Sequence, residues 1–155
     1  MVYLTTLPGL VIALALALED IRSRTIPRTW VAAGLLVQTA ALCLSSAMTG
    51  RWEVLILALA LGAASAGLQA CLALVRPGAL GMGDVTCTGL TGLSLGALGW
   101  VTALVWWLLM GLIGALALGV AALLARREKG PVSIPFAPVI VGAAILAGLA
   151  AVVMG

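Results

Sequence analysis

The sequence predicts an all-α integral membrane protein, a bundle of about six transmembrane helices. Two observations indicate this class. Hydrophobic residues make up 64% of the 155-residue chain and charged residues only 8%, and the mean hydropathy is +1.28. A soluble domain of this length needs far more charge to cover its surface. Because lipid offers the backbone no hydrogen bonds, spanning segments of this composition must be helices.

Six apolar runs are candidate spans, since a transmembrane helix needs about 20 mostly apolar residues. In chain order they are Leu4–Leu18, Trp30–Ser46, Val54–Val75, Leu80–Leu98, Trp100–Ala125 and Ile134–Met154. We expect one membrane-embedded domain over residues 1–155, because the connections are too short to hold a second core.

The charges of the connections predict an orientation. Of the eight basic residues, the first, third and fifth connections carry seven, whereas the second carries only Arg51. The positive-inside rule then puts those three connections in the cytoplasm and both termini outside. Membrane orientation therefore explains the basic residues, and we expect the lipid bilayer rather than nucleic acid as the partner of this chain.

Tryptophans and glycines suggest how the helices are placed. Trp30, Trp52 and Trp100 stand at predicted helix starts, as in an interfacial aromatic belt. Trp106 and Trp107 fall mid-span, where helix packing is the expected role. The fourth span has a small-residue face suited to close helix contact. That face consists of Gly89, Gly92, Gly96 and Gly99.

The inventory of reactive side chains excludes most catalytic classes. The chain has no histidine, which removes Ser-His and Cys-His pairs and most metal sites, so neither a metal nor another cofactor is expected. Cys43, Cys71 and Cys87 are far apart and indicate apolar packing rather than zinc or redox chemistry. Any catalysis must use the few carboxylates, hydroxyls and the backbone.

Two aspartates meet the same boundary of the predicted bundle. Asp20 ends the first span and Asp84 begins the fourth, so both arrive at the cytoplasmic side. A carboxylate in a membrane costs on the order of 2.5–3.5 kcal/mol, so it usually faces a cavity or a partner. The alternative is that both are solvated loop residues or helix caps. If the two meet, they share one proton, and the pair can carry out aspartyl proteolysis.

Three stretches resemble the motifs of type IV prepilin peptidases. "EDIRSRTIPRTW" resembles the D-x-R-x-x-x-I-P-N motif of that family, "GMGDVT" resembles its GxGD motif, and "SIPFAPVIVGA" resembles the beginning of its last span. The three occur in the family's order and cover most of the chain. The resemblance implies an intramembrane aspartyl endopeptidase with Asp20 and Asp84 as its catalytic pair. Around them it implies supporting roles for a set of motif residues: Pro27, Gly81, Gly83, Thr86 and Pro135.

Further expectations follow from the resemblance. Such enzymes remove the short basic leader of prepilins at the cytoplasmic face of the bacterial inner membrane, so a prepilin-like membrane peptide is the expected substrate. The first span begins almost at Met1, without the cysteine-rich region of larger relatives, so no separate methyltransferase domain is expected. The chain is most similar in organisation to the short, peptidase-only form that serves Flp/Tad-type pili. No oligomeric state follows from the sequence.

The motifs depart from the family pattern at three positions. Thr86 stands where lysine is usual, Arg28 where asparagine follows the proline, and Ala137 where glycine is usual. These departures motivate a second hypothesis, a catalytically degenerate relative that acts as a pilus or secretion assembly partner. A third is a small proton-coupled transporter, against which the position of both carboxylates near one face argues. Gly81 and Gly83 have two readings as well, a tight turn into the fourth span or close approach of substrate backbone.

Overall fold

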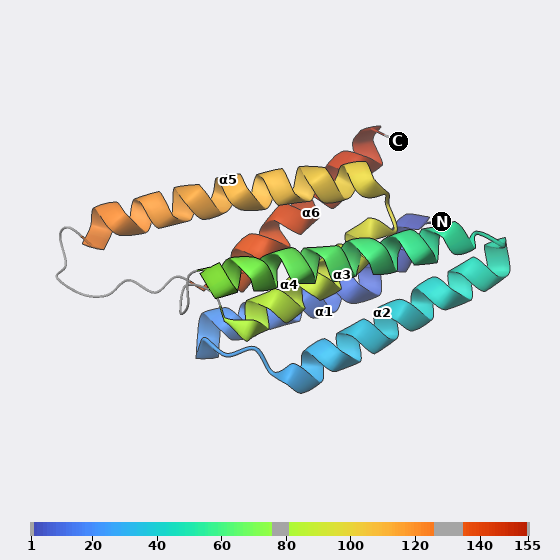
Figure 1. The fold of residues 1–155 in the computed structure, drawn as a ribbon, viewed down its shortest axis with the longest axis horizontal. Helices are drawn as coiled ribbons and strands as arrows, with labels where there is room; N and C mark the ends of the chain where they lie inside the picture. Colours follow the sequence, from blue (N-terminus) through green and yellow to red (C-terminus); the bar gives the residue numbers. More distant parts are fainter. Residues whose placement is uncertain (1, 76–80, 126–134, 155) are drawn as a thin grey trace.

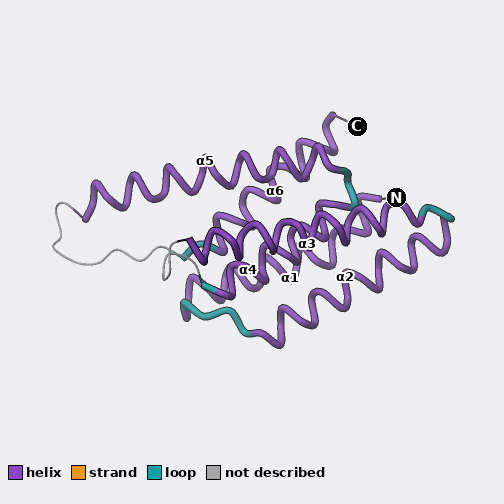
Figure 2. Tube along the Cα trace, viewed as in Figure 1, coloured by secondary structure: helices purple, strands orange, loops and turns teal. Residues whose placement is uncertain are grey.

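The computed structural model describes residues 2–75, 81–125 and 135–154, which form six helices and no strand (Figure 1, Figure 2). The helices are α1 (Val2–Ser23), α2 (Arg28–Thr49), α3 (Trp52–Val75), α4 (Met82–Gly96), α5 (Trp100–Ala125) and α6 (Ala137–Met154). All of them except α4 are long and apolar enough to cross a membrane. The predicted all-α membrane bundle is confirmed.

The helix bounds differ from the predicted spans where polar residues begin. Helix α1 continues past the predicted end at Leu18 to Ser23, so Asp20 lies inside the helix and not at its end. Helix α4 is 15 residues long and starts at Met82. The predicted start of the fourth span at Leu80 lies outside the described residues.

The two ends of the bundle carry different connections. Both termini lie at one end, next to the α2–α3 and α4–α5 turns, whereas the α1–α2 connection lies at the other (Figure 1). Arg51 belongs to the first of these ends, and Arg22, Arg24 and Arg28 belong to the second. The remaining basic residues lie outside the described ranges, and the sidedness of the bundle stays a prediction.

Helix α4 is the centre of the bundle. It contacts each of the other five helices, and within Val85–Gly96 every residue is buried except Thr86, which is half-buried. The hydroxyls of Thr91 and Ser94 donate to the carbonyl four residues earlier, at 2.8 and 2.9 Å. The other helices thus shield α4 from lipid, and a short helix with several hydroxyls can remain in the apolar layer.

Small residues allow α3 and α4 to approach closely. A Cβ on Gly96 would lie 2.9 Å from the Cα of Ala58, and one on Gly92 would lie 2.9 Å from the Oγ of Ser65. Gly89 also faces α3, so three members of the predicted small-residue face are confirmed. The prediction for the fourth is wrong. Gly99 lies in the α4–α5 turn, where its φ of +108° favours glycine.

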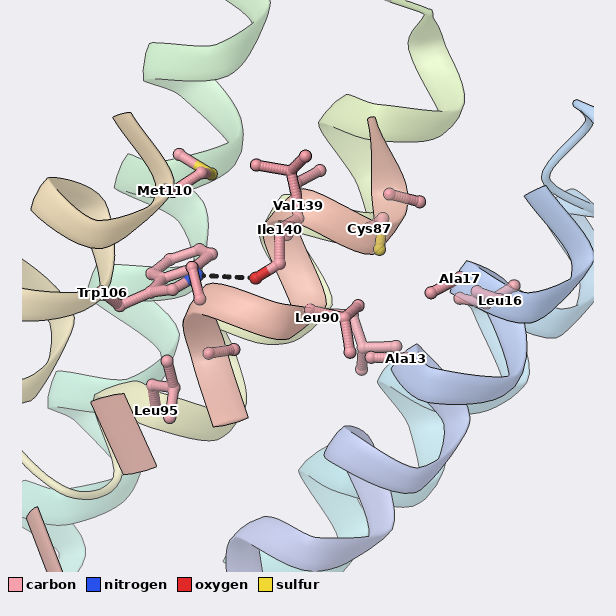
Figure 3. Close-up of a cluster of buried hydrophobic side chains, with 14 of the residues drawn as sticks. Ala13, Leu16, Ala17, Cys87, Leu90, Leu95, Trp106, Met110, Val139 and Ile140 are labelled. Atoms are coloured by element: carbon pink, nitrogen blue, oxygen red, sulfur yellow. Dashed lines mark hydrogen bonds between the residues drawn. The ribbon is translucent and has the colours of Figure 1, made fainter. Parts of the chain in front are cut away.

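The five tryptophans fall into two packing residues and three exposed residues, as the sequence predicts. Trp106 is fully buried and its Nε1–H donates to the carbonyl of Ile140 at 3.0 Å, which ties α5 to α6 (Figure 3). The Nε1–H of Trp107 donates to the Oγ of Ser65 at 3.1 Å, which ties α5 to α3. The packing role predicted for both is confirmed. The other three tryptophans lie in the first turns of α2, α3 and α5 and are exposed.

Substitution of Gly96 by alanine should separate α3 from α4. The new methyl group would meet the backbone of Ala58, which cannot move independently of its helix, so we expect a loss of about 1–3 kcal/mol in stability. The matched control is Gly111→Ala in α5, where a Cβ would meet nothing within 4 Å. Thermal unfolding in detergent micelles should show a lower Tm for Gly96→Ala alone. Equal Tm values would contradict the close contact.

Candidate active site

Asp20 joins the end of α1 to the beginning of α6. Its side chain is buried, and its Oδ2 accepts a hydrogen bond from the backbone N–H of Ala137 at 3.3 Å. Ala137 is the first residue of α6, so its N–H has no partner within that helix. The partial positive charge at the start of α6 attracts the Asp20 carboxylate. Asp20 therefore caps α6 from a neighbouring helix.

Asp84 caps its own helix. It lies in the first turn of α4, and its Oδ2 accepts a hydrogen bond from the backbone N–H of Gly81 at 3.0 Å. Gly81 is the N-cap residue, so the contact is the carboxylate half of a capping box. The helix-cap alternative considered for Asp84 is thus part of the structure. The side chain is only half-buried, which leaves it accessible from the end of the bundle.

The structure brings the two carboxyl groups within electrostatic range of each other. The charge of Asp20 acts on the Asp84 carboxyl, and both carboxyl charges also reach Cys87, one turn further along α4. The Cys87 side chain is fully buried, in agreement with the packing role predicted for it.

Gly83 lets the α1–α2 connection pack against the start of α4. A Cβ on Gly83 would lie 2.8 Å from the Cβ of Ile26, the isoleucine of the first motif. Gly81 has no such neighbour among the described residues, where a Cβ would meet only the Oδ2 of Asp84 at 3.5 Å and the N of Gly83 at 3.9 Å. Neither glycine has a positive φ among the described residues. Close packing against Ile26 explains the glycine at position 83. Because neither Gly81 nor Gly83 has a positive φ, the predicted turn does not itself require a glycine.

The other predicted support residues shape the backbone around the two aspartates. Pro27 is the N-cap of α2, and its carbonyl accepts hydrogen bonds from the N–H groups of Trp30 and Val31 at 3.1 and 3.3 Å. Pro135 is half-buried and lies two residues before α6 begins, so it precedes the helix, although the predicted span began at Ile134. The Oγ1 of Thr86 lies 2.9 Å from the carbonyl oxygen of Gly83, to which it donates.

Two contacts of this site were not predicted from the sequence. The Ala137 N–H that binds Asp20 is a backbone group, for which side-chain patterns carry no signal. The contact of Ile26 with Gly83 joins two of the three motifs. The hint available in the sequence was that both motifs were predicted to lie at the same membrane boundary. Glu19, next to Asp20, is half-buried, and Arg22 and Arg24 are exposed.

Comparison with known families identifies the family of this chain. A model of the type IV leader peptidase family matches residues 7–119, which include both aspartates. The chain belongs to the type IV leader peptidase family. No curated protein and no solved structure matches it. The matched range ends within α5, so the contact of Asp20 with α6 is a feature that the structure adds to the family match.

Gly83→Ala should impair this leader peptidase more than Gly81→Ala. The added methyl group would displace Ile26 and the connection from the first turn of α4, where Asp84 lies. A displacement near 1 Å in an active site costs up to about 100-fold in rate, so we expect peptidase activity to fall at least roughly tenfold. Activity per folded enzyme is the measurement. Equal activities of the two variants would show that the contact with Ile26 does not position Asp84.

Proposed function

We propose that this protein is an intramembrane aspartyl endopeptidase that removes the short basic leader from prepilin-like substrates. Asp20 and Asp84 are its catalytic pair, and cleavage takes place at the cytoplasmic face of the bacterial inner membrane. The observation that carries the proposal is the approach of these two carboxyl groups at one end of the bundle. The family match supports the peptidase class, and the absence of histidine from the sequence leaves few other catalytic groups.

The two aspartates would divide the chemistry of peptide hydrolysis. Two neighbouring carboxyl groups share one proton, so one aspartate is ionised and the other is protonated. The ionised aspartate takes a proton from a water molecule, whose oxygen attacks the scissile carbonyl carbon. The protonated aspartate donates its proton to the carbonyl oxygen, which becomes a hydroxyl of the tetrahedral intermediate. Collapse of this intermediate breaks the C–N bond. The leaving nitrogen takes the proton that the first aspartate received, and one hydroxyl of the intermediate returns a proton to the second aspartate, which leaves a carboxylic acid and restores the pair.

The position of the pair suits a membrane-anchored substrate. A prepilin carries its leader just before a hydrophobic helix, so its scissile bond lies at the membrane boundary. Asp84 is half-buried in the first turn of α4 and Asp20 lies in the last turns of α1, near the end of the bundle that holds the α1–α2 connection. Water can reach that level, whereas at the bilayer centre it could not. Two carboxyls at one end also favour hydrolysis over the transporter hypothesis.

Asp20→Asn and Asp84→Asn should each abolish leader cleavage without unfolding the protein. An asparagine oxygen can still accept the N–H of Ala137 or Gly81, but it cannot exchange a proton at neutral pH, so we expect a loss of about 10²–10⁴-fold. Cleavage of a co-expressed prepilin, followed by the mass of its product, measures the effect. Glu19→Gln is the control and should retain activity. Full activity of either aspartate variant would exclude the pair.

The departures from the family motifs allow a test of the degenerate-relative hypothesis. The Thr86 hydroxyl is bonded to the carbonyl of Gly83 in its own helix, and the Arg28 side chain is exposed. Neither residue contacts the two aspartates through a hydrogen bond in the described structure. We therefore expect cleavage by the wild type, and no more than a severalfold change in Thr86→Lys and Arg28→Asn. An inactive wild type that either substitution activates would favour the degenerate relative.

A further inference from the structure

Gln38 is a fully buried amide in the middle of a membrane-spanning helix. It belongs to α2, and both polar atoms of its side chain bond to α1. The backbone N–H of Gly9 donates to its Oε1 at 2.8 Å, and its Nε2 donates to the carbonyl oxygen of Thr5 at 2.9 Å. Gly9 and Thr5 stand in the i and i−4 relation that a regular α-helix pairs directly. The Gln38 amide therefore bridges the donor and the acceptor of one turn of α1.

A proline stands next to this bridge in α1. Pro8 lies within the helix, and a proline provides no N–H and its ring crowds the carbonyl four residues earlier, here that of Leu4. Gln38 bonds to the donor and acceptor that follow, the N–H of Gly9 and the carbonyl of Thr5. These two hydrogen bonds fasten α1 to α2 at one defined height, beside the turn that the proline weakens.

The same turn is where α1 approaches α4. A Cβ on Gly9 would overlap the Oγ of Ser94 in α4 and would lie 2.8 Å from the Oε1 of Gln38. Three helices thus meet around the backbone of Gly9, and no larger residue fits between them. The Ser94 hydroxyl is itself fixed, because it donates to the carbonyl of Leu90 at 2.9 Å. A helix held on two sides in this way cannot slide along its axis without breaking these contacts.

The contact lies at nearly the same distance from both aspartates. At 1.5 Å per residue, Asp20 lies about 16.5 Å from Gly9 along α1, and Asp84 lies about 15 Å from Ser94 along α4. The two helices are antiparallel (Figure 1), so these similar lengths bring both carboxyls close to one level. A slip of α1 by one residue would move Asp20 by about 1.5 Å along the axis and require a turn of about 100° to restore the packing. The level of the pair therefore depends on the height at which Gln38 holds α1.

We propose that Gln38 is a positioning residue that sets the register of α1 against α4 and so keeps Asp20 level with Asp84. The proposal rests on the proposed function, in which these two aspartates act together. Gln38 touches neither the substrate nor the reacting atoms, and it acts through the α1 backbone. Its loss should therefore reduce the rate of the chemical step more than the binding of substrate.

Gln38→Met provides the test, because methionine has nearly the same length and cannot form either hydrogen bond. We expect kcat for prepilin leader cleavage to fall by about 100-fold per folded enzyme, with KM changed less than about threefold. Gln69→Met is the matched control, since Gln69 is equally buried, in α3, and takes no part in the hydrogen bonds to α1. It should keep kcat within about twofold. An unchanged kcat in Gln38→Met, or an equal loss in Gln69→Met, would overturn the proposal.

Gln38→Glu separates the hydrogen bonds from general packing. A protonated glutamate can accept from Gly9 and donate to Thr5, whereas an ionised one can only accept. The residues that face this side chain are Thr5 and Gly9 from α1 and Ser94 from α4, and none of them is titratable. At the acid end of the activity range, this variant should recover most of the kcat lost in Gln38→Met. Equal impairment of both variants at every pH would contradict the proposal.

A distance measurement tests the register without any assay of activity. Spin labels at Leu18→Cys in α1 and Met82→Cys in α4 would occupy two exposed positions near the level of the aspartates, after the three natural cysteines are replaced by alanine. Gln38→Met should shift or broaden the distance distribution by about 1.5 Å or more, the rise of one residue. An unchanged distance distribution in Gln38→Met would refute the role of Gln38 in setting the register, whatever the activity of the enzyme. If the wild type cleaves no leader, the proposed function is refuted, and the distance measurement alone then decides whether Gln38 sets the register.

Discussion

A helix with four hydroxyl side chains, four glycines and an aspartate gains little from contact with lipid, and α4 is such a helix. The other five helices surround it, so its polar groups face protein, and the hydroxyls of Thr86, Thr91 and Ser94 bond to its own backbone. Its glycines let α3 approach until the backbones of the two helices nearly meet. The bundle is arranged around this requirement, and a carboxylate can enter the apolar layer on a helix that its neighbours cover from Val85 onward.

Both aspartates serve the fold as well as the proposed chemistry. Asp84 bonds to the start of α4 and Asp20 bonds to the start of α6. Each carboxylate is therefore held by a helix N-terminus, a backbone group that does not rotate as a side chain can. The shared end of α1, α4 and α6 forms around the pair. A site assembled from helix ends is rigid without additional side chains.

Much of this architecture could be predicted from the sequence, and the failures have physical reasons. Apolar runs predicted the helices, and the spacing of Gly89, Gly92 and Gly96 predicted the close contact of α4. The start of α4 at Met82 could not be predicted from the apolar pattern, because a local hydrogen bond stabilises the first turn of this helix. Pro8 and Gln38 are both visible in the sequence. Their pairing could not be predicted, since it depends on which helices are neighbours.

The enclosure of α4 also constrains how the chain enters the membrane. Helices α1, α2 and α3 precede it and are long and apolar enough to insert in sequence, whereas α4 has fewer residues than a bilayer crossing needs and gains its environment only from its neighbours. We therefore expect α4 to enter last among the first four, drawn in by a groove that α1 and α3 already offer. Asp84 then reaches Asp20 only when the surrounding helices are in place. A half-inserted chain would have no paired carboxyls, and assembly of the membrane fold would itself control when the site first exists.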